Sequence, residues 1–309
     1  MILKPQHLKK NFIKFIDTNM KKFPFTSILG WSSSRYDVFS TCKRKYYYRY
    51  YAKHDTDFAL DQINRLKQLT TVPLTVGSIA HDVIETLLKR LQISDSDIDT
   101  SRLKEHIAKL VEGTIQKSEF FELYYQKQEE LDKESMVDAI YKCLQLFIES
   151  DRYAWINQQP MDQRHKWVIE PPGFGETRIN DLKAYCKVDC MIPTDDGVFI
   201  FDWKTGKNDV AKHRKQLIGY SLYAHNNFGH PEKDIRAFVV YLKGIFDEAE
   251  LELQEGEVKQ FYETFVDDTT EMQSYCADVD KNTPKGKESF PMIDSGLCAY
   301  CEFKELCGK

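Results

Sequence analysis

The stretch Val198-Phe199-Ile200-Phe201-Asp202-Trp203-Lys204-Thr205-Gly206 decides the fold. It begins with four apolar residues, which is typical of a strand buried within a sheet, and ends with an aspartate and a lysine two positions apart. Side chains alternate across a strand, so Asp202 and Lys204 lie on one face and Trp203 on the other. Ionisable groups at the end of a buried strand need a partner or a function. The sequence therefore predicts a site at this end of the sheet.

A second aspartate precedes this strand, in Lys187-Val188-Asp189-Cys190. Residues 183–192 and 197–203 are predicted to form two strands joined by the turn-forming Thr194-Asp195-Asp196-Gly197, which places Asp189 beside Asp202. Residues 165–170 predict an earlier strand, ended by Pro171-Pro172-Gly173.

Helical patterns surround these strands. In residues 77–92 the apolar positions follow a helical period, and His81 and Glu85 lie four residues apart, on one helix face. Gly77 permits this helix to pack closely against the sheet. Further helices are predicted at 33–51, which begins with capping serines, and at 210–227 and 255–279, with one more strand at 236–242. The core order is helix, three strands, helix, strand.

Composition sets the limits on fold and location. The chain has 309 residues, 42% hydrophobic and 29% charged, which is ordinary for a soluble globular protein. It contains no apolar run long enough to span a membrane, and Met1-Ile2-Leu3-Lys4-Pro5 lacks the features of a secretory signal, so a cytoplasmic location is expected. The net charge of -5 decides little, because an enzyme acting on a polyanion needs only a local positive channel.

The side chains at the strand ends suit a divalent cation. Magnesium and manganese prefer oxygen ligands, so Asp189 and Asp202, with His81 and the carbonyl of Trp203, predict such a site. Lys204 is placed to stabilise negative charge developing on a phosphodiester or to position the attacking water.

Each of these residues also has a structural interpretation. An Asp-x-Lys pair can be a cross-strand ion pair, and His81 a core histidine. Glu85, a further candidate at the active site, can form a salt bridge on its helix surface. Glu170 is either a third acid near the metal or simply a strand-terminal residue, and the second interpretation is favoured.

The complete pattern resembles a known family. Gly77-Ser78-Ile79-Ala80-His81 with Glu85, then Val188-Asp189, then residues 201–206, then Gln216-Leu217-Ile218-Gly219-Tyr220-Ser221-Leu222-Tyr223-Ala224 resemble the PD-(D/E)XK nuclease superfamily, in particular its RecB-like branch. The resemblance implies that His81, Asp189 and Asp202 bind metal, that Lys204 is catalytic, and that Gln216 and Tyr220 shape the site. It also implies an α/β, restriction-endonuclease-like core, a small mixed central sheet flanked by helices.

The boundaries expected for a single nuclease domain spanning 1–309 follow from this pattern. No internal repeat or long low-complexity linker divides the chain. Its expected parts are an N-terminal helix region at 28–55, a helical insertion or cap at 95–160, the catalytic sheet core at 165–245, and a C-terminal helix with a cysteine cluster at 255–309.

The chain has eight cysteines, and three of them, Cys298, Cys301 and Cys307, form C-x2-C-x5-C at its end. With Cys42 as the best fourth candidate, four thiolates suit either a [4Fe-4S] cluster or structural zinc. The arrangement resembles iron-sulfur members of the RecB-like branch, including AddB-type and CRISPR-adaptation nucleases, and this resemblance favours iron-sulfur. Either metal would link the N- and C-terminal regions. Ordinary buried thiols are expected at the remaining positions, Cys143, Cys186, Cys190 and Cys276.

Two basic stretches are candidates for DNA binding. Lys43 and Arg44 stand among tyrosines, which suits phosphate contacts with base stacking, although a tyrosine-rich helix packed on the sheet is at least as good an explanation. The better candidates follow the Asp-x-Lys strand directly: Lys207, Lys212, His213, Arg214 and Lys215.

The sequence thus predicts a DNA nuclease dependent on Mg²⁺ or Mn²⁺, acting on single-stranded or end-frayed DNA in repair, recombination or defence, as an exonuclease rather than an endonuclease. The alternative is a catalytically idle, cluster-linked DNA-binding subunit of a helicase-nuclease or defence complex. No G-x-x-x-x-G-K-[ST] phosphate loop occurs, so any helicase motor would come from a partner.

Overall fold

The computed structural model describes residue 23 and residues 26–95, 99–171, 175–179, 181–253 and 256–309. Its α-helices are α1 (Ser33–Thr41), α2 (Lys43–Tyr51), α3 (Leu60–Gln68), α4 (Val72–Leu91), α5 (Leu103–Lys117), α6 (Phe121–Tyr124), α7 (Lys133–Ile148), α8 (Asp151–Asn157), α9 (Val210–Phe228) and α10 (Glu257–Gln273). Its strands are β1 (Val168–Ile169), β2 (Glu176–Ile179), β3 (Leu182–Tyr185), β4 (Cys190–Thr194), β5 (Gly197–Lys204), β6 (Ile235–Lys243), β7 (Ile245–Leu251), β8 (Cys276–Asp278) and β9 (Thr283–Pro284). Short 3-10 helices are η1 (Ala52–His54), η2 (Thr100–Arg102), η3 (Arg164–Lys166), η5 (Glu232–Asp234), η6 (Lys287–Ser289), η7 (Gly296–Tyr300) and η8 (Lys304–Cys307).

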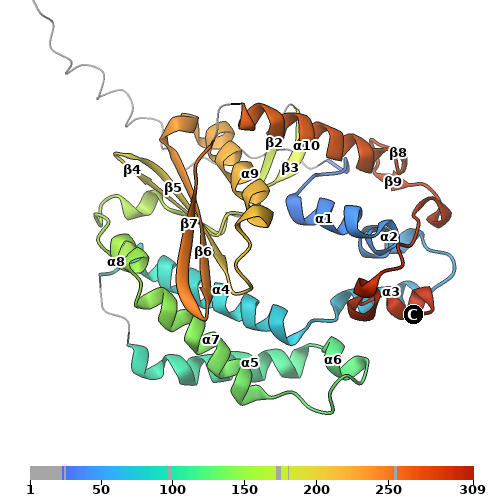
Figure 1. The fold of residues 1–309 in the computed structure, drawn as a ribbon, viewed down its shortest axis with the longest axis horizontal. Coiled ribbons are helices and arrows are strands. Elements are labelled where there is room, and N and C mark those ends of the chain that lie inside the picture. Colours follow the sequence, from blue (N-terminus) through green and yellow to red (C-terminus); the bar gives the residue numbers. More distant parts are fainter. Residues whose placement is uncertain (1–22, 24–25, 96–98, 172–174, 180, 254–255) are drawn as a thin grey trace, which may run out of the picture.

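The central sheet has the strand order β1-β4-β5-β6-β7 (Figure 1). β5 and β6 are parallel, with Lys204 opposite Tyr241, and the other neighbouring pairs are antiparallel. Parallel neighbours need a long connection, and α9 supplies it between β5 and β6. The C-terminal end of β5, which carries Asp202 and Lys204, therefore lies close to the start of α9.

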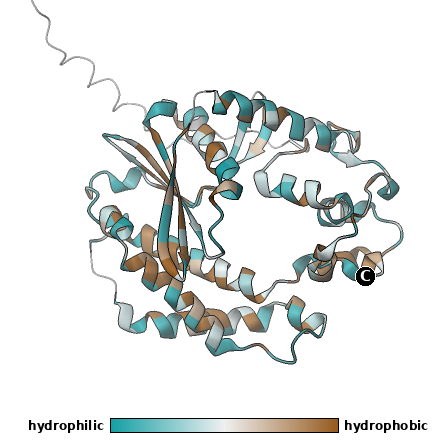
Figure 2. Ribbon diagram, in the orientation of Figure 1, coloured by the Kyte–Doolittle hydropathy of each residue, from teal (hydrophilic) through white to brown (hydrophobic). Residues whose placement is uncertain are grey.

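Each face of the sheet is covered by its own hydrophobic core. On β5, Val198 and Ile200 pack with residues of α9, α10, α1 and α2, whereas Phe199, Phe201 and Trp203 pack with residues of α4, α5 and α7. Asp202 and Lys204 share the α9 side by the strand's alternation. Figure 2 shows the hydrophobic colouring concentrated on the central strands and on α7.

The helices that reach the site begin at capped residues. The side chains of Thr71 and Asp209 accept hydrogen bonds from the first turns of α4 and α9, and Pro73 occupies a position in α4 that needs no N–H donor. α4 then packs closely against the end of β5, because a side chain at Gly77 would come within 3.0 Å of Thr205 Oγ1. This close approach brings His81 to the sheet.

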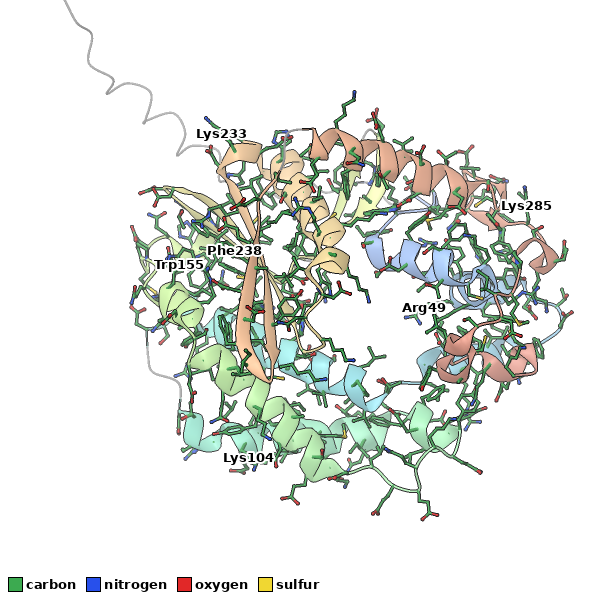
Figure 3. The ribbon with its side chains drawn as sticks, viewed as in Figure 1. Arg49, Lys104, Trp155, Lys233, Phe238 and Lys285 are labelled. Atoms are coloured by element: carbon green, nitrogen blue, oxygen red, sulfur yellow. The ribbon has the colours of Figure 1, made fainter. Side chains whose placement is uncertain are left out.

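Arg152, in α8, covers part of the sheet face that lies away from α9. Its guanidinium lies 5.3 Å from the Trp155 ring and 4.5 Å from the Phe238 ring, and forms an ion pair with Glu248 at 2.8 Å. Figure 3 labels Trp155 and Phe238 on the same side of the view. The contact is structural and lies away from the Asp-x-Lys face.

The C-terminal segment packs on α2, far away in sequence (Figure 1). The backbone N–H of Arg44 donates to the Pro291 carbonyl over 3.1 Å, and Arg49, labelled in Figure 3, forms an ion pair with Glu302 at 3.0 Å. Four tyrosines of α2 are buried in the core, Tyr46, Tyr47, Tyr48 and Tyr51. The two regions are therefore joined by ordinary contacts in addition to any metal.

Several predicted elements are wrong in detail. The helix expected at 33–51 is broken at Cys42, whose backbone is extended, and the strand expected at 183–192 is two strands separated by residues 186–189. The helix expected at 255–279 ends at Gln273, and its first residue lies outside the described part of the chain. The first predicted strand is reduced to Val168–Ile169, and β2, β7, β8 and β9 add to the expected element order.

The expected fold class is confirmed: a mixed α/β structure in which helices flank a mostly antiparallel central sheet, as in restriction-endonuclease-like proteins. Within the described ranges, no helix combines the length and apolar character that crossing a bilayer requires. Residues 1–5, on which part of the expected location rests, lie outside those ranges.

Candidate active site

Six of the predicted catalytic and metal-binding residues line one cleft of about 740 Å³. α4 contributes His81, the segment before β4 contributes Asp189, and β5 contributes Asp202 and Lys204. α9 contributes Gln216 and Tyr220. The rest of the wall comes mainly from the start of α1 and from residues 185–187. The structure thus brings together residues that span 139 positions of the sequence, from 81 to 220.

Asp189 connects the sheet to α4. Its Oδ2 atom accepts a hydrogen bond from the backbone N–H of Trp203 over 2.8 Å and lies 3.5 Å from His81 Nδ1. The Trp203 ring is buried on the other face of the sheet. The backbone of β5 therefore fixes the carboxylate that faces the imidazole.

Asp202 and Lys204 form the second half of the site. Lys204 Nζ lies 2.5 Å from Asp202 Oδ2 and donates to Gln216 Oε1 over 3.1 Å. Gln216 in turn donates to the Tyr220 hydroxyl, which donates to the carbonyl of Lys187 over 2.7 Å and lies 3.4 Å from Asp202 Oδ1. The lysine is held by two neighbours whose own positions are fixed.

The surroundings of the two carboxylates shift their pKa values in opposite directions. Burial, followed by the charge of Asp189, raises the pKa of Asp202 to about 6. Burial also opposes ionisation of Asp189, but His81 and Lys204 outweigh it and lower the pKa of Asp189. For His81, burial opposes protonation, and the Asp189 carboxylate outweighs it and raises the pKa of His81. Because the charges of Asp189 and Asp202 repel each other, a positive charge beside them is needed for both to ionise fully.

Glu170 joins the site, although the sequence favoured a merely strand-terminal role for it. Ligand atoms of His81, Glu170 and Asp189 all lie within 4.8 Å of one another. β1 pairs with β4, and the backbone N–H of Glu170 donates to the carbonyl of Asp189. The carboxylate of Glu170 also forms an ion pair with Lys187. Pairing of the two predicted strands was the feature of the sequence that could have indicated this position.

The donor set fits a hard divalent cation. It combines carboxylate oxygens with one imidazole, the ligand types suited to magnesium or manganese. Asp202 is buried, and its Oδ2 atom has the Lys204 ammonium as its close neighbour. Burial and the charge of Asp189 leave this carboxylate in need of further positive charge, which a metal ion would add.

Glu85 is on the same face of α4 as His81, one turn further on, and forms an ion pair with Lys89. It is outside the group of His81, Glu170 and Asp189. Its position is that of a residue beside the site.

The predicted DNA-binding residues differ in their surroundings. Lys212 lines the cleft, and Lys207 is exposed beyond the end of β5; neither side chain has a partner among the described residues. Arg214 forms an ion pair with Glu257 at 2.6 Å, and Lys215 pairs with Asp268 at 2.6 Å.

The remaining two basic candidates, both on α2, hold neighbouring parts of the structure. Lys43 forms an ion pair with Glu271 at 3.0 Å. Arg44 donates to the carbonyl of Phe290 over 2.9 Å and to that of Lys287 over 3.3 Å.

The four candidate cluster cysteines lie together. Cys42, Cys298, Cys301 and Cys307 line one small cavity of about 20 Å³, and all four are free thiols. Burial is the main cause that raises the pKa of Cys307, and the nearby Cys42 and Cys298 add to it. Cys42 itself has the extended backbone that separates α1 from α2, and this break places its side chain at the cavity. A helix running through 33–51 would not present it in this way.

A comparison with protein families identifies the superfamily of this chain. The sequence model of the PD-(D/E)XK nuclease superfamily matches residues 30–308. Among solved structures, the chain is similar to one described as "Crystal structure of SSO0001", at 17% sequence identity and a TM-score of 0.27, over 73% of this chain and 96% of that chain. No curated protein matches. Because the family model covers nearly the whole chain, from before α1 to the last cysteine, this protein belongs to the PD-(D/E)XK nuclease superfamily.

Proposed function

We propose that this protein is a deoxyribonuclease dependent on Mg²⁺ or Mn²⁺, acting on single-stranded or end-frayed DNA and as an exonuclease rather than an endonuclease. Membership of the nuclease superfamily gives the reaction class. One observation carries the assignment to these residues: the linked Asp202, Lys204 and Gln216 stand in one cleft with Asp189 and His81. A functional site needs this kind of fixed geometry between charged groups.

Asp189, Asp202 and His81 would hold the cation, with Glu170 as a fourth ligand beside them. When bound, the cation polarises the phosphodiester and lowers the pKa of a coordinated water. The protein's own contribution is to keep Asp189 ionised, through the Trp203 N–H, His81 and Lys204. The backbone therefore prepares one strong anionic ligand before any cation arrives.

Lys204 supplies positive charge to the reacting phosphate. Its ammonium has a third N–H beyond those facing Asp202 and Gln216, and it is a donor for a phosphoryl oxygen or the attacking water. A donor already held in place needs little reorganisation when negative charge develops in the transition state.

The proposed substrate is supported by the basic side chains of the cleft. Lys212 lines it and Lys207 follows β5, and both are free to contact a phosphate backbone. The ion pairs of Arg214, Lys215 and Lys43 favour structural roles for those residues. A positively charged groove that follows the phosphate backbone is typical of proteins that bind single strands.

We further propose that Cys42, Cys298, Cys301 and Cys307 bind a [4Fe-4S] cluster of the kind found in RecB-like nucleases, with structural zinc as the alternative. Their placement around one cavity, from opposite ends of the chain, supports a shared metal. The metal would reinforce the contact between α2 and residues 286–309. A cytoplasmic protein with a role in repair, recombination or defence, working with a helicase partner, is consistent with this chemistry.

Digestion of labelled DNA tests the proposal. Linear single strands labelled at either end, linear duplexes and single-stranded circles are incubated with Mg²⁺, with Mn²⁺ and with a chelator. We expect metal-dependent cutting of linear single strands and little cutting of circles. Resistance of every substrate with both metals would contradict the proposed activity.

A further inference from the structure

His213 is fixed by a partly buried chain of hydrogen bonds that the proposed catalytic steps do not use. It lies in the first turn of α9 and lines the cleft together with Lys204 and Gln216. Its Nδ1 atom is 2.9 Å from the hydroxyl of Tyr241. Tyr241 is fully buried on β6, directly opposite Lys204 in the parallel pairing.

The direction of each hydrogen bond follows from the donors available. The backbone N–H of Asp209 donates to the Tyr241 oxygen over 3.1 Å. Burial raises the pKa of Tyr241, so the phenol keeps its proton. Since the Tyr241 oxygen already accepts from Asp209, we assign the phenol as the donor to its other partner among the described residues, His213 Nδ1.

This chain selects one tautomer of the imidazole. A neutral histidine that accepts at Nδ1 carries its own proton at Nε2. No hydrogen-bond partner of Nε2 is found among the described residues, and the side chain is half-buried at the wall of the cleft. His213 therefore presents a fixed N–H donor that has no acceptor in the described part of the chain.

We infer that His213 binds a non-bridging oxygen of a substrate phosphate through Nε2–H, beside Lys204 in the same cleft. The inference rests on the proposed nuclease function and specifies a backbone contact of that substrate. A preoriented donor binds a phosphate oxygen without first losing conformational freedom. Tyr241 acts as a positioning residue, since it touches the imidazole and not the DNA.

The charge of this contact differs from that of a lysine contact. Burial lowers the pKa of His213, and the neighbouring Lys204 and Lys212 add to the effect, so the ring is neutral near pH 7. A neutral donor releases few counterions from DNA on binding. Replacing His213 should thus weaken binding with little change in its salt dependence.

Equilibrium binding of a fluorescent single-stranded oligonucleotide in chelator tests the inference without cleavage. His213→Phe keeps the ring and removes the N–H, and we expect it to weaken binding about tenfold or more, as for a lost hydrogen bond to a charged group. His213→Gln carries an amide N–H near the position of Nε2 and should restore most of the affinity. Tyr241→Phe should give an intermediate loss.

Oligonucleotides with one neutral methylphosphonate at successive positions identify the contact. At the phosphate bound by His213, the wild type should lose affinity and His213→Phe should lose no more. Equal penalties for both proteins at every position, or failure of His213→Gln to recover binding, would overturn the inference. His225→Phe, the same substitution at the other end of α9, is the matched control and should bind normally. Absence of cleavage by the wild type would instead count against the proposed function, because the binding comparison does not depend on it.

Discussion

Glu170 and Asp189 lie opposite each other where β1 meets β4, and the backbone N–H of Glu170 donates to the Asp189 carbonyl over 3.2 Å. Glu170 has a φ of 45°, in the left-handed region that non-glycine residues adopt at a cost of about 1 kcal/mol. Its carboxylate nevertheless comes within 4.8 Å of the ligand atoms of His81 and Asp189. Strained backbone of this kind is concentrated at functional sites, which favours Glu170 as a metal ligand.

Glu170→Gln should therefore weaken binding of Mn²⁺ about tenfold or more, because it removes one anionic oxygen from the group. Isothermal titration of metal-free protein with MnCl₂ measures the change. Glu105→Gln, at an exposed position on α5, is the control and should bind as the wild type does. An unchanged affinity in Glu170→Gln would restore the strand-terminal role favoured by the sequence.

Asp202 should make the metal-free protein less stable as pH rises. Its pKa is about 6 in the folded protein and 3.8 as the ordinary value, so the folded state holds the proton more tightly. The contribution of Asp202 to the free energy of unfolding is thus greatest below about pH 4 and decreases as pH rises to about 6. The total decrease is on the order of 3 kcal/mol.

Asp202→Asn lacks this ionisation. Its stability relative to wild type should rise across the same pH window, as measured by urea unfolding in chelator at pH 4, 5, 6 and 7. Asp189, whose pKa is lowered, acts in the opposite direction but is present in both proteins. A stability difference that does not vary with pH would show that Asp202 ionises normally.

Lys212 and Arg214 should behave differently despite their proximity on α9. Lys212→Ala is expected to weaken DNA binding and reduce the slope of log affinity against log salt by about 0.7, the value for one contact to a single strand. Arg214→Ala breaks the ion pair with Glu257 and should lower stability by roughly 1 kcal/mol while the slope stays the same. Binding titrations at four salt concentrations, with thermal unfolding of both variants, separate the two effects.

How far the sequence predicts the site depends on the residue. Strand alternation placed Asp202 and Lys204 on one face of the sheet, and the helical period placed His81 on one face of its helix. Asp189 was placed beside Asp202 by the turn predicted between their two strands. The cleft that they line also contains Gln216 and Tyr220. The sequence did not place Glu170 beside His81 and Asp189, because that position depends on which strands pair, and a two-residue strand such as β1 carries almost no periodicity.

The errors in the predicted helices and strands have similar physical causes. β7 was missed because it is an edge strand rich in acids, Ile245-Phe246-Asp247-Glu248-Ala249-Glu250-Leu251, whose pattern does not resemble a buried strand. The strand predicted at 183–192 is only partly apolar, and its middle leaves the sheet at residues 186–189, which brings Asp189 to the cleft. Cys42 breaks the first helix for a tertiary reason, since its thiol faces the C-terminal cysteines.

The cysteine cavity should hold iron. Protein purified without oxygen is expected to be brown, with broad absorption near the blue end of the visible spectrum. Cys42→Ala should lose the colour and make residues 286–309 more accessible to protease, although the contacts of Arg44 and Arg49 keep part of the interface. Cys276→Ala, outside the cavity, is the matched control. Colourless wild-type protein with one equivalent of zinc would decide for the alternative metal.

The central claim is that Asp202 and Lys204 carry out metal-dependent hydrolysis of DNA. The most direct measurement is the rate of Mn²⁺-stimulated cleavage of an end-labelled single strand by wild type, Asp202→Ala and Lys204→Ala, with folding of each protein checked by circular dichroism. We expect both variants to be folded and to lose cleavage by a factor of at least about 100, as for removal of a transition-state charge contact. Cleavage at the wild-type rate by both folded variants would contradict the account.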